Sequence, residues 1–550
     1  MKVNLGTFEG SFSKLLKELK KNDVLNRIWQ KDYTVWKPSQ NEISNRLDWL
    51  TTIDLMKKNV PDIQLFVKGL MKEGFQHVLL IGMGGSSLAA EVFRNTFAIK
   101  KGFLALEVLD SIHPEEILSI QKRINFKKTL FVISTKSGST LETLSLLKYF
   151  FNLALKQLDN RTVGDQFIAI TDPGSSLEKL SEDLKFRKVF LNDPNIGGRF
   201  SALSYFGLIP AGLMGVDLNE ILNRAQSTSE NCREFEKNPA INLGISLGLL
   251  AKNGFDKIHL CLSKEIESFG DWIEQLIAES TGKEKLGILP VLRNNFGGER
   301  HLKVLINLKN DRNLTNPFKE QKTPYIQITL NDSYDLGGQF FLWEMATAVC
   351  GTLMKINPFD QPNVESSKAI TKRFISEYGK NKKKNFPRPA YSEKGIDVYC
   401  DGSISNFKDG FIKILHSEND ISYVAIQAFL PKTKQIHQRL EKFQNVIQKN
   451  FEVVTTIGYG PRYLHSTGQL HKGDSGKGRF IQISAEVEKD LNVPDHVGEE
   501  ISSIGFGSLL LFQAMGDYQA LLDAKRKIIQ FHIQKDLLLN LDLLLKSVIY

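Results

Sequence analysis

Apolar and polar positions along this chain predict short strands and amphipathic helices that follow one another in a regular order. Residues 77–97 begin with a short apolar run, pass through a glycine-rich turn and continue with helical periodicity. Residues 128–150 and 166–184 repeat this plan. Strand–loop–helix units in series predict a parallel sheet flanked by helices, with ligands at the carboxyl ends of its strands.

A second block of the same kind lies downstream of a helical segment at residues 197–254. A helix is expected over 271–279, and the helix-rich stretch 357–380 closes the block. The strand-like runs of this block are 257–263, 301–309 and 325–330. The shared plan predicts two related α/β subdomains, although the two blocks have little sequence in common.

The stretch 380–395 has the Lys, Pro and Gly residues of a linker, and a third, smaller α/β domain is predicted beyond it. A chain of 550 residues is too long for one ordinary core, so several domains are expected. The predicted fold class is α/β, with two parallel-sheet subdomains flanked by helices and a C-terminal α/β domain. The predicted divisions are a helical lead-in (1–74), the first subdomain (75–200), the second subdomain (201–385) and the C-terminal domain (386–550).

Charge and composition narrow the classes of partner. A hydrophobic content of 41% and a charged content of 24% are those of an ordinary globular protein. The net charge is +9, but acids and bases are interspersed, which indicates a mildly basic surface suited to phosphorylated small molecules. Only Lys380 to Lys384 forms a concentrated basic run, and we interpret it as a solvated linker rather than a nucleic-acid site.

The sequence also bears on the cellular compartment. Its apolar runs fall short of the roughly 20 residues that a membrane helix needs, and the N-terminal stretch is charged where a signal peptide would be apolar. The cysteines lie far apart without a CxxC pair, which indicates a reducing compartment rather than a zinc site or a disulfide framework. We therefore expect a cytoplasmic protein with no membrane and no nucleic-acid partner. The cysteines are Cys232, Cys261, Cys350 and Cys400.

Two glycine- or hydroxyl-rich loops follow predicted strands of the first subdomain. In the first loop, residues 82–87 (GMGGSS), glycines let the backbone approach an anion, and the following helix presents free N–H groups. This signal is weak alone, because Ser87 takes the place of the last glycine of GxGxxG and no Lys follows as in a P-loop. A tight packing turn is the alternative interpretation.

The second loop, residues 135–140 (TKSGST), strengthens the case for phosphate binding. Its hydroxyls, with that of Thr143, can donate hydrogen bonds to phosphate oxygens, and Lys136 adds positive charge. Helix capping explains one such hydroxyl, not the four within this loop. Two loops of this kind on successive predicted strands predict a phosphate pocket. Its candidate residues are Gly85, Ser86, Thr135, Lys136, Ser137, Thr140 and Thr143.

Four blocks, in order along the chain, resemble the phosphoglucose isomerase family of sugar isomerase (SIS) domains. Residues 134–143 (STKSGSTLET) resemble the phosphate loop, and residues 197–217 resemble the first signature. Residues 273–283 (IEQLIAESTGK) resemble the segment with the catalytic base, and residues 357–368 (NPFDQPNVESSK) the C-terminal signature. The tail at 455–473 is similar to the isomerase half of bacterial transaldolase–phosphoglucose isomerase fusions, and no transaldolase half is expected in this chain.

The resemblance implies two SIS-type subdomains and the interconversion of glucose 6-phosphate and fructose 6-phosphate through a cis-enediol. It assigns Glu279 as the base that moves the proton between C1 and C2, and Arg199 as the cation that stabilises the enediolate. It implies that Lys368 opens the sugar ring and that Gln361 positions a substrate hydroxyl. From their spacing alone, Glu279 would be a capping residue, Arg199 a structural ion pair and Lys368 a solvated helix lysine.

The sequence departs from the better-known family pattern at one point. Those enzymes use a histidine for ring opening just ahead of the helix that precedes the NPFDQ-like block, and residues 335–339 (DLGGQ) contain none. Either Lys368 acts alone or another group supplies the acid. His465 and His471, in a polar loop of the C-terminal domain, are the candidates, and a surface loop without a catalytic role is the alternative.

Two other functions stay open at this point. Mannose 6-phosphate shares the same enediol, so it is a second candidate substrate. A sugar-phosphate sensor would keep the phosphate loops without a base, and the presence of Glu279, Arg199 and Lys368 together argues against it. No metal or organic cofactor is expected, because the scattered histidines form no ligand pattern and an enediol mechanism requires no metal. The family's usual homodimer is the expected assembly.

Overall fold

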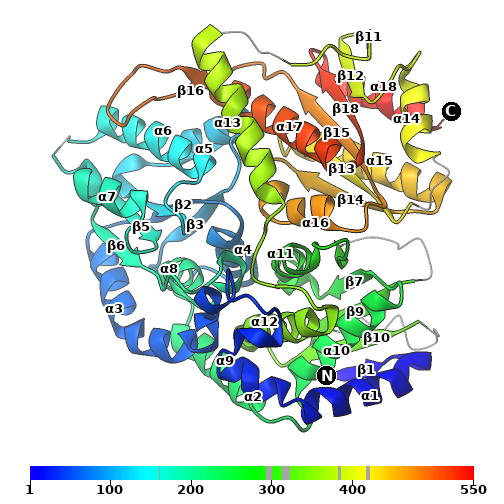
Figure 1. The fold of residues 1–550 in the computed structure, drawn as a ribbon. Coiled ribbons are helices and arrows are strands. Elements are labelled where there is room, and N and C mark those ends of the chain that lie inside the picture. Colours follow the sequence, from blue (N-terminus) through cyan, green and yellow to red (C-terminus); the bar gives the residue numbers. More distant parts are fainter. Residues whose placement is uncertain (160, 293–299, 312–322, 382–385, 417–420, 550) are drawn as a thin grey trace.

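The computed structural model describes residues 1–549 except 160, 293–299, 312–322, 382–385 and 417–420. Three large sheets, each flanked by helices, organise the described chain (Figure 1). The predicted α/β class is confirmed, with two parallel-sheet subdomains and a C-terminal α/β domain. Residues 382–385 of the predicted linker lie outside the described residues.

The first sheet is parallel throughout, with strand order β3-β2-β4-β5-β6. Its strands β4 and β5 are buried along their whole length, and their continuous apolar runs are typical of strands covered on both faces. The strands are β2 (His77–Gly82), β3 (Ala105–Leu109), β4 (Thr129–Ser134), β5 (Phe167–Thr171) and β6 (Lys188–Leu191). The helices are α4 (Leu88–Thr96), α5 (Pro114–Arg123), α6 (Leu141–Gln157) and α7 (Ser176–Asp183).

The second sheet has the order β1-β10-β9-β7-β8, in which only β1 runs antiparallel to its neighbour. The expected helical lead-in thus begins with a strand, β1 (Lys2–Asn4), which pairs with a strand far along the chain. The other strands are β7 (Lys257–Leu262), β8 (Leu289–Leu292), β9 (Leu302–Leu308) and β10 (Tyr325–Leu330). The helices of the lead-in are α1 (Glu9–Lys21), α2 (Val24–Trp29) and α3 (Thr52–Lys72).

Six further α-helices lie in sequence between the first sheet and the C-terminal domain among the described residues. The long helix α12 is buried almost from end to end and packs against α9 and α10. The six are α8 (Tyr205–Leu213), α9 (Leu218–Asn231), α10 (Pro239–Lys252), α11 (Phe269–Thr281), α12 (Leu336–Met354) and α13 (Val364–Asn381). In Figure 1, α13 leaves the second subdomain and runs up alongside the C-terminal domain.

The third sheet, in the C-terminal domain, has the order β11-β12-β18-β15-β13-β14. Its strands are β11 (Tyr391–Glu393), β12 (Ile396–Cys400), β13 (Tyr423–Phe429), β14 (Val454–Tyr459), β15 (Gly478–Ala485) and β18 (Lys527–Ile533). Its helices are α14 (Phe407–Leu415), α15 (Lys434–Phe451), α16 (Gly468–Gly473), α17 (Phe506–Asp523) and α18 (Leu537–Ile549). A separate small pair, β16 (Asn492–Val493) and β17 (Ile504–Gly505), lies between β15 and α17 in sequence.

All three sheets share one order of parallel strands. Counted along the chain within each sheet, the first strand lies between the second and the third, and the fourth follows the third. This holds for β3-β2-β4-β5, for β8-β7-β9-β10 and for β14-β13-β15-β18. In such open sheets, ligands bind at the carboxyl ends of the strands. The C-terminal domain therefore repeats the strand order of the two subdomains.

Apolar contacts join the C-terminal domain to both subdomains. One buried cluster combines Phe429 and Tyr463 of the C-terminal domain with Ile81 and Ile133 of the first sheet. Another combines residues of α11 and β8 with residues of β13, β15 and α17. Because the interfaces contain buried apolar side chains, removing the C-terminal domain would expose apolar surface on both subdomains. The domain is thus an integral part of the folded chain.

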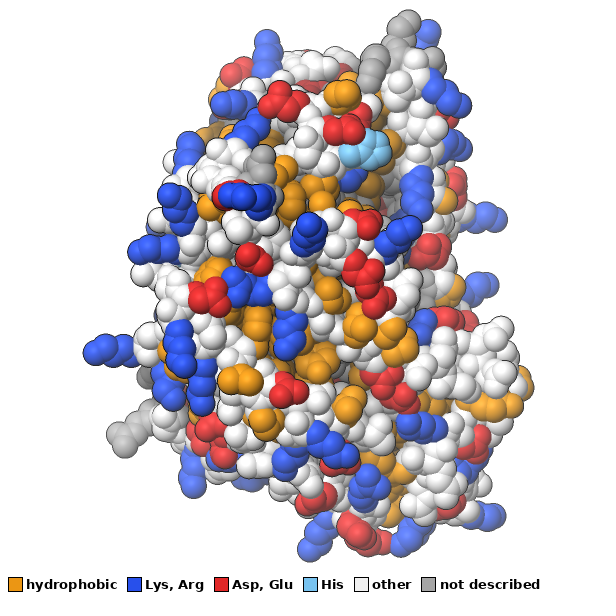
Figure 2. All heavy atoms as spheres, turned by 90° about the vertical axis from the view of Figure 1, so that its left-hand side faces the viewer, with side chains coloured by type: hydrophobic (Ala, Val, Ile, Leu, Met, Phe, Trp, Pro, Cys, Tyr) orange, Lys and Arg blue, Asp and Glu red, His pale blue; other side chains and the backbone are white. Residues whose placement is uncertain are grey.

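The surface of the first subdomain shows how its charges are distributed. Figure 2 shows this face with Lys and Arg interspersed with Asp and Glu, and with apolar side chains between them. The mixture agrees with the pattern that the sequence predicts for this part of the chain. Across the described residues, every helix is too short or too polar to cross a bilayer.

Candidate active site

The two predicted phosphate loops lie side by side at the carboxyl ends of the neighbouring strands β2 and β4. The first contains the short helix η5 (Gly84–Ser86), and the second precedes α6. Ser134 donates a hydrogen bond of 2.7 Å to the backbone oxygen of Ser86, which ties the loops together. Backbone N–H groups and hydroxyls from two loops therefore meet at one edge of the sheet, as an anion site requires.

The candidate phosphate residues of the second loop differ in how much of their bonding capacity is free. The hydroxyls of Thr135 and Thr140 lie 2.9 Å apart and bond to each other. Lys136 pairs with Asp172 and donates to the backbone oxygen of Pro194 at 2.9 Å. Ser137 is exposed, whereas Thr143 is fully buried and its hydroxyl has no hydrogen-bond partner.

Gly85 brings the first loop against the segment that carries Arg199. A Cβ atom at position 85 would lie 2.1 Å from the backbone oxygen of Gly198 and 2.9 Å from the backbone nitrogen of Arg199. Such distances leave no room for a side chain, so the two backbones touch because residue 85 is glycine. Ser86, like Gly85, is half-buried beside this contact.

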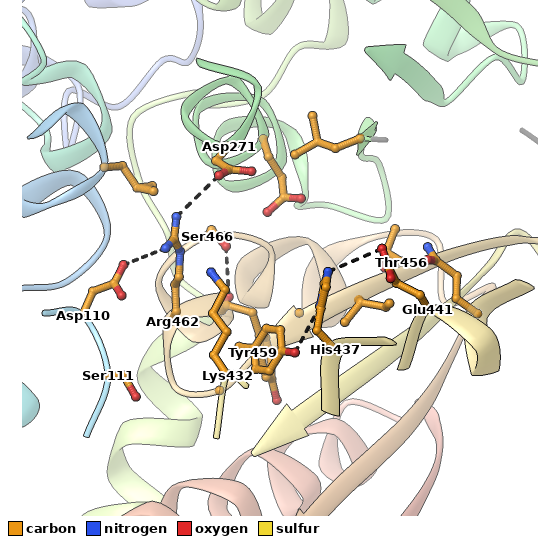
Figure 3. Close-up of a pocket in the computed structure, with 18 of the residues that line it drawn as sticks. Asp110, Ser111, Asp271, Lys432, His437, Glu441, Thr456, Tyr459, Arg462 and Ser466 are labelled. Atoms are coloured by element: carbon orange, nitrogen blue, oxygen red, sulfur yellow. Dashed lines mark hydrogen bonds and ion pairs between the residues drawn. The ribbon is translucent and has the colours of Figure 1, made fainter. Parts of the chain in front are cut away.

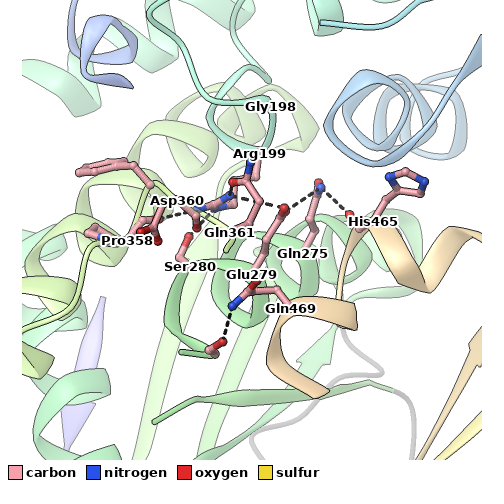
Figure 4. Close-up of polar contacts among 12 residues, drawn as sticks. Gly198, Arg199, Gln275, Glu279, Ser280, Pro358, Asp360, Gln361, His465 and Gln469 are labelled. Carbon is pink, nitrogen blue, oxygen red and sulfur yellow. Dashed lines mark hydrogen bonds and ion pairs between the residues drawn. The ribbon is translucent and has the colours of Figure 1, made fainter. Parts of the chain in front are cut away.

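Arg199 lies in the short helix η8 (Gly198–Phe200) and is held on every side (Figure 4). Its guanidinium donates to Ser280 Oγ at 2.7 Å and to Gln361 Oε1 at 3.0 Å. It also donates to the backbone oxygens of Pro358 at 2.7 Å and Asp360 at 3.0 Å. Burial lowers the pKa of the Arg199 guanidinium, while the nearby Glu279 carboxylate opposes that shift.

Glu279, the predicted base, lies in the last turns of α11 with Oε1 at 3.5 Å from the Arg199 guanidinium. Its side chain is 13% exposed, so the carboxylate keeps a path to the surface. Gln275, one helical turn earlier, donates to Glu279 Oε2 at 3.2 Å. Arg199, Glu279 and Gln361, which are far apart in sequence, are thus brought together.

Two charged residues that were not predicted from the sequence, Lys283 and Asp360, belong to the same cluster. Lys283 is buried, and its Nζ donates to Asp360 Oδ1 at 2.6 Å and to the backbone oxygen of Asp360 at 2.5 Å. Burial lowers the pKa of the Lys283 ammonium to about 8, and the nearby Arg199 lowers it as well. Both residues stand inside the blocks that carry the resemblance, so their position in those blocks is the signal that could have found them.

Lys368 and His471 are not brought into this cluster. Lys368 lies on α13 with its side chain 53% exposed, and it pairs with Glu365 at 2.8 Å. His471 is buried in the C-terminal domain, where its ring packs near Tyr423, Tyr463 and Phe480. The desolvation of this buried ring lowers the pKa of His471 well below its ordinary value, which favours the neutral form.

The segment of the C-terminal domain that forms η11 (Arg462–His465) and α16 contacts the cluster. Gln469 donates to the backbone oxygen of Gly282 at 2.8 Å and to Asn363 Oδ1 at 2.7 Å. It thereby joins the segment after Glu279 to the segment after Gln361. His465 meets Glu142 of α6 at 2.9 Å through Nε2.

Arg462 of the C-terminal domain contacts both subdomains (Figure 3). Its guanidinium lies 3.0 Å from Asp110 Oδ2 at the end of β3 and 3.7 Å from Asp271 Oδ2 on α11. These carboxylates raise the pKa of Arg462, although burial lowers it. A cavity of about 190 Å³ lies beside this contact, and both subdomains and the C-terminal domain line it. The C-terminal domain contributes Lys432, His437 and Tyr459 to this lining. The C-terminal domain is thus docked by charge as well as by apolar packing.

The cluster has the chemistry of a proton-transfer site. Two cations, Arg199 and Lys283, face two carboxylates, Glu279 and Asp360. When Glu279 accepts a proton from a carbon beside a carbonyl, its negative charge passes to the substrate oxygens. Arg199 lies close enough to Glu279 to stabilise the charge before and after this transfer. Among the described residues, no group of three or more His, Cys, Asp or Glu is placed to hold a metal ion.

Comparisons with known proteins show which proteins this chain resembles. The family model described as phosphoglucose isomerase matches residues 51–287. A probable glucose-6-phosphate isomerase from Methanococcus maripaludis is 29% identical over 347 residues, covering 54% of this chain and 78% of the relative. A glucose-6-phosphate isomerase from Campylobacter jejuni is 27% identical over 376 residues, covering 59% of this chain and 90% of the relative.

Solved structures show the same fold. A hypothetical protein from Thermus thermophilus superposes with a TM-score of 0.58 at 23% identity, over 68% of this chain and 99% of that one. A glucose-6-phosphate isomerase from Chlamydia trachomatis gives a TM-score of 0.56 at 18% identity, over 68% of this chain and 87% of that one. The family match and the curated relatives together show that residues 51–287 of this chain are similar to phosphoglucose isomerases.

Proposed function

We propose that this protein interconverts glucose 6-phosphate and fructose 6-phosphate as an aldose–ketose isomerase. The observation that carries the proposal is the pairing of Glu279 with the buried, fully bonded Arg199, in a chain whose residues 51–287 match the phosphoglucose isomerase family model. Curated relatives that share this family are named as glucose-6-phosphate isomerases. A carboxylate next to a fixed cation is what proton transfer beside a carbonyl needs.

In the proposed mechanism, the Glu279 carboxylate removes the proton from C1 of open-chain fructose 6-phosphate. The electrons of the C–H bond form the C1–C2 double bond, and the carbonyl oxygen at C2 takes the negative charge. Arg199 neutralises this oxygen as the cis-enediol forms, since its guanidinium is already positioned by four hydrogen bonds. The hydroxyl proton of O1 then passes to O2, so that the negative charge moves to O1. The protonated Glu279 returns its proton to C2 while the electrons of O1 form the C1 carbonyl, which gives the aldehyde of glucose 6-phosphate.

We assign the phosphate group to the two loops at the ends of β2 and β4. Gly85 would offer its backbone N–H group and Ser86 its hydroxyl, because the Ser86 N–H already donates to the Met83 oxygen at 3.1 Å. The hydroxyls of the second loop would complete the oxyanion contacts. The candidates in that loop are Thr135, Lys136, Ser137, Thr140 and, in the first turn of α6, Thr143. Gln361, which bonds Arg199 at 3.0 Å, would position a substrate hydroxyl.

For ring opening we keep Lys368, which the family resemblance implies. It stands on α13, one turn beyond the segment that carries Gln361. Its exposed ammonium pairs with Glu365, so the assignment requires that this surface ion pair break when substrate binds. Surface pairs of this kind contribute only about 0–1 kcal/mol, so substrate phosphate or hydroxyl groups can displace them.

We also infer a cytoplasmic setting, because all four cysteines are free thiols and none forms a disulfide.

The test of the reaction is turnover of fructose 6-phosphate in D2O, followed by proton NMR of the product. Glucose 6-phosphate with deuterium at C2 would support the enediol mechanism, since a proton held on Glu279 exchanges with solvent. Mannose 6-phosphate in the same spectra would extend the substrate range. Binding of fructose 6-phosphate without turnover would favour a sugar-phosphate sensor.

A further inference from the structure

His465 reaches two parts of the site through two different atoms. It ends the short helix η11 (Arg462–His465) of the C-terminal domain. This helix lies against η5 of the first phosphate loop, since a Cβ on Gly84 would be 2.9 Å from the His465 backbone oxygen and 3.0 Å from its Cβ. The C-terminal domain therefore touches the phosphate loop at this residue.

The imidazole of His465 is anchored to the helix that follows the second phosphate loop. Its Nε2 lies 2.9 Å from Oε1 of Glu142, in the first turn of α6. The same carboxylate oxygen accepts from Gln513 of α17 at 2.7 Å. Burial alone would raise the pKa of Glu142, but His465 and Gln513 lower it to about 2, so the carboxylate is ionised. Because an ionised carboxylate only accepts, Nε2 of His465 is the donor of this bond.

The backbone oxygen of His465 is linked to the proposed base through one side chain. It accepts from Gln275 Nε2 at 2.8 Å, and the same nitrogen donates to Glu279 Oε2 at 3.2 Å. Gln275 is almost completely buried, so its amide has little freedom to move. Figure 4 shows the carbonyl side of His465 directed at Gln275, with the imidazole ring turned away from Glu279.

We propose that His465 is a positioning residue that couples the phosphate pocket to the base, by holding Glu142 with its ring and Gln275 with its backbone. This inference rests on the proposed isomerase function. It differs from the role of ring-opening acid, because the ring nitrogen in contact is already bonded to Glu142 and the ring faces away from Glu279. A displacement of Glu279 by a fraction of an ångström is enough to slow proton transfer.

The test compares a cyclic and an acyclic substrate. Fructose 6-phosphate closes its ring through O5, whereas 5-deoxyfructose 6-phosphate lacks that hydroxyl and stays open. Exchange of the C1 proton with D2O reports turnover of both compounds. We expect His465→Ala to lower kcat about 10–100-fold for both substrates alike, because the base is displaced in each case. We expect the double variant with Glu142→Gln to be no slower than His465→Ala alone, because the two residues act as one unit.

Two further variants keep the test decisive. In His465→Gln the amide can still donate to Glu142 but cannot titrate, so recovery of most of the lost kcat, with an unchanged pH profile, is expected. His437→Ala serves as the matched control, since this histidine of the same domain bonds Tyr459 and Glu441 at the separate cavity of Figure 3. It should keep wild-type kcat and melting temperature.

Other outcomes would overturn the inference. Loss on fructose 6-phosphate with full activity on the acyclic substrate would make His465 the ring-opening acid. Unchanged activity in His465→Ala, or a multiplicative loss in the double variant, would show that no coupling exists. A wild-type protein that exchanges neither substrate would instead refute the proposed function, and the inference with it.

Discussion

Replacing Arg199 by Lys is the substitution whose consequences the structure specifies most fully. The guanidinium uses Nε and both Nη atoms to bond Ser280, Gln361 and the backbone oxygens of Pro358 and Asp360. It is also 3.5 Å from Glu279 Oε1. A lysine keeps the charge, but its ammonium is a single point with three donors and cannot reproduce a planar fork.

The expected loss of kcat in Arg199→Lys follows from the hydrogen bonds that are lost. The four hydrogen bonds of Arg199 exceed the three donors of an ammonium, so at least one acceptor loses its partner. A hydrogen bond to a charged group is worth about 1.5–3 kcal/mol. Removing one donor from an oxyanion site typically lowers kcat about 10²–10³-fold. We therefore expect Arg199→Lys to lose about 10²-fold in kcat, and Arg199→Met to lose about 3–5 kcal/mol of stability as well.

A coupled assay measures this effect by converting the glucose 6-phosphate formed from fructose 6-phosphate with a dehydrogenase. Thermal unfolding measured in parallel distinguishes a loss of catalysis in the folded protein from a loss of folded protein. Arg224→Lys is the matched control, because Arg224 lies on α9 in partly exposed ion pairs with Glu220 and Asp335. It should stay within about twofold of wild type. A value of kcat for Arg199→Lys within threefold of wild type would refute the assignment of Arg199.

Three further changes test separate parts of the account. Gly85→Ala should lower kcat/KM about 10²-fold, since its Cβ would stand 2.1 Å from the Gly198 oxygen, whereas Gly10→Ala, with open space around it, should not; equal activities would contradict this contact. Lys368→Met should lower turnover of fructose 6-phosphate but spare 5-deoxyfructose 6-phosphate, and an equal loss on both would remove its ring-opening role. Glu344 is buried with neither carboxylate oxygen bonded, and burial raises its pKa well above the ordinary value. The folded state therefore holds a proton that the unfolded state releases, so stability falls as pH rises above the unfolded pKa of about 4.3. Glu344→Met should gain about 1–3 kcal/mol at pH 8 and progressively less toward pH 5, as measured by urea unfolding; a gain independent of pH would refute the role of ionisation.

The fold could be predicted where hydrophobic runs and turns follow one another locally. The units at 77–97, 128–150 and 166–184 correspond to β2 with α4, β4 with α6 and β5 with α7. The strand β1 could not be found in this way, because three residues carry no period and its partner β10 lies far along the chain. The docking of the C-terminal domain also depends on contacts between distant residues, such as Arg462 with Asp110 and Asp271.

The candidate site, like the fold, could be predicted from the sequence only in part. Glu279, Arg199 and Gln361 came from blocks of resemblance, and the structure brings them into contact. Gln275 and Lys283 stand in one of those blocks, but only their tertiary contacts reveal a role. Lys368 stays a prediction, because no contact with the cluster accompanies it. The domain boundaries at 74, 200 and 385 and the similarity to transaldolase fusions also stay predictions.

The central claim is that Glu279 moves the proton in an aldose–ketose isomerisation. The most direct measurement compares wild type with Glu279→Gln in the coupled assay for glucose 6-phosphate formed from fructose 6-phosphate. The amide keeps the size of the side chain and can still meet Gln275, but it cannot accept the proton. We predict robust wild-type turnover and a loss of at least about 10³-fold in kcat for the variant, with an unchanged melting temperature. A variant that keeps most of the wild-type activity would contradict the account.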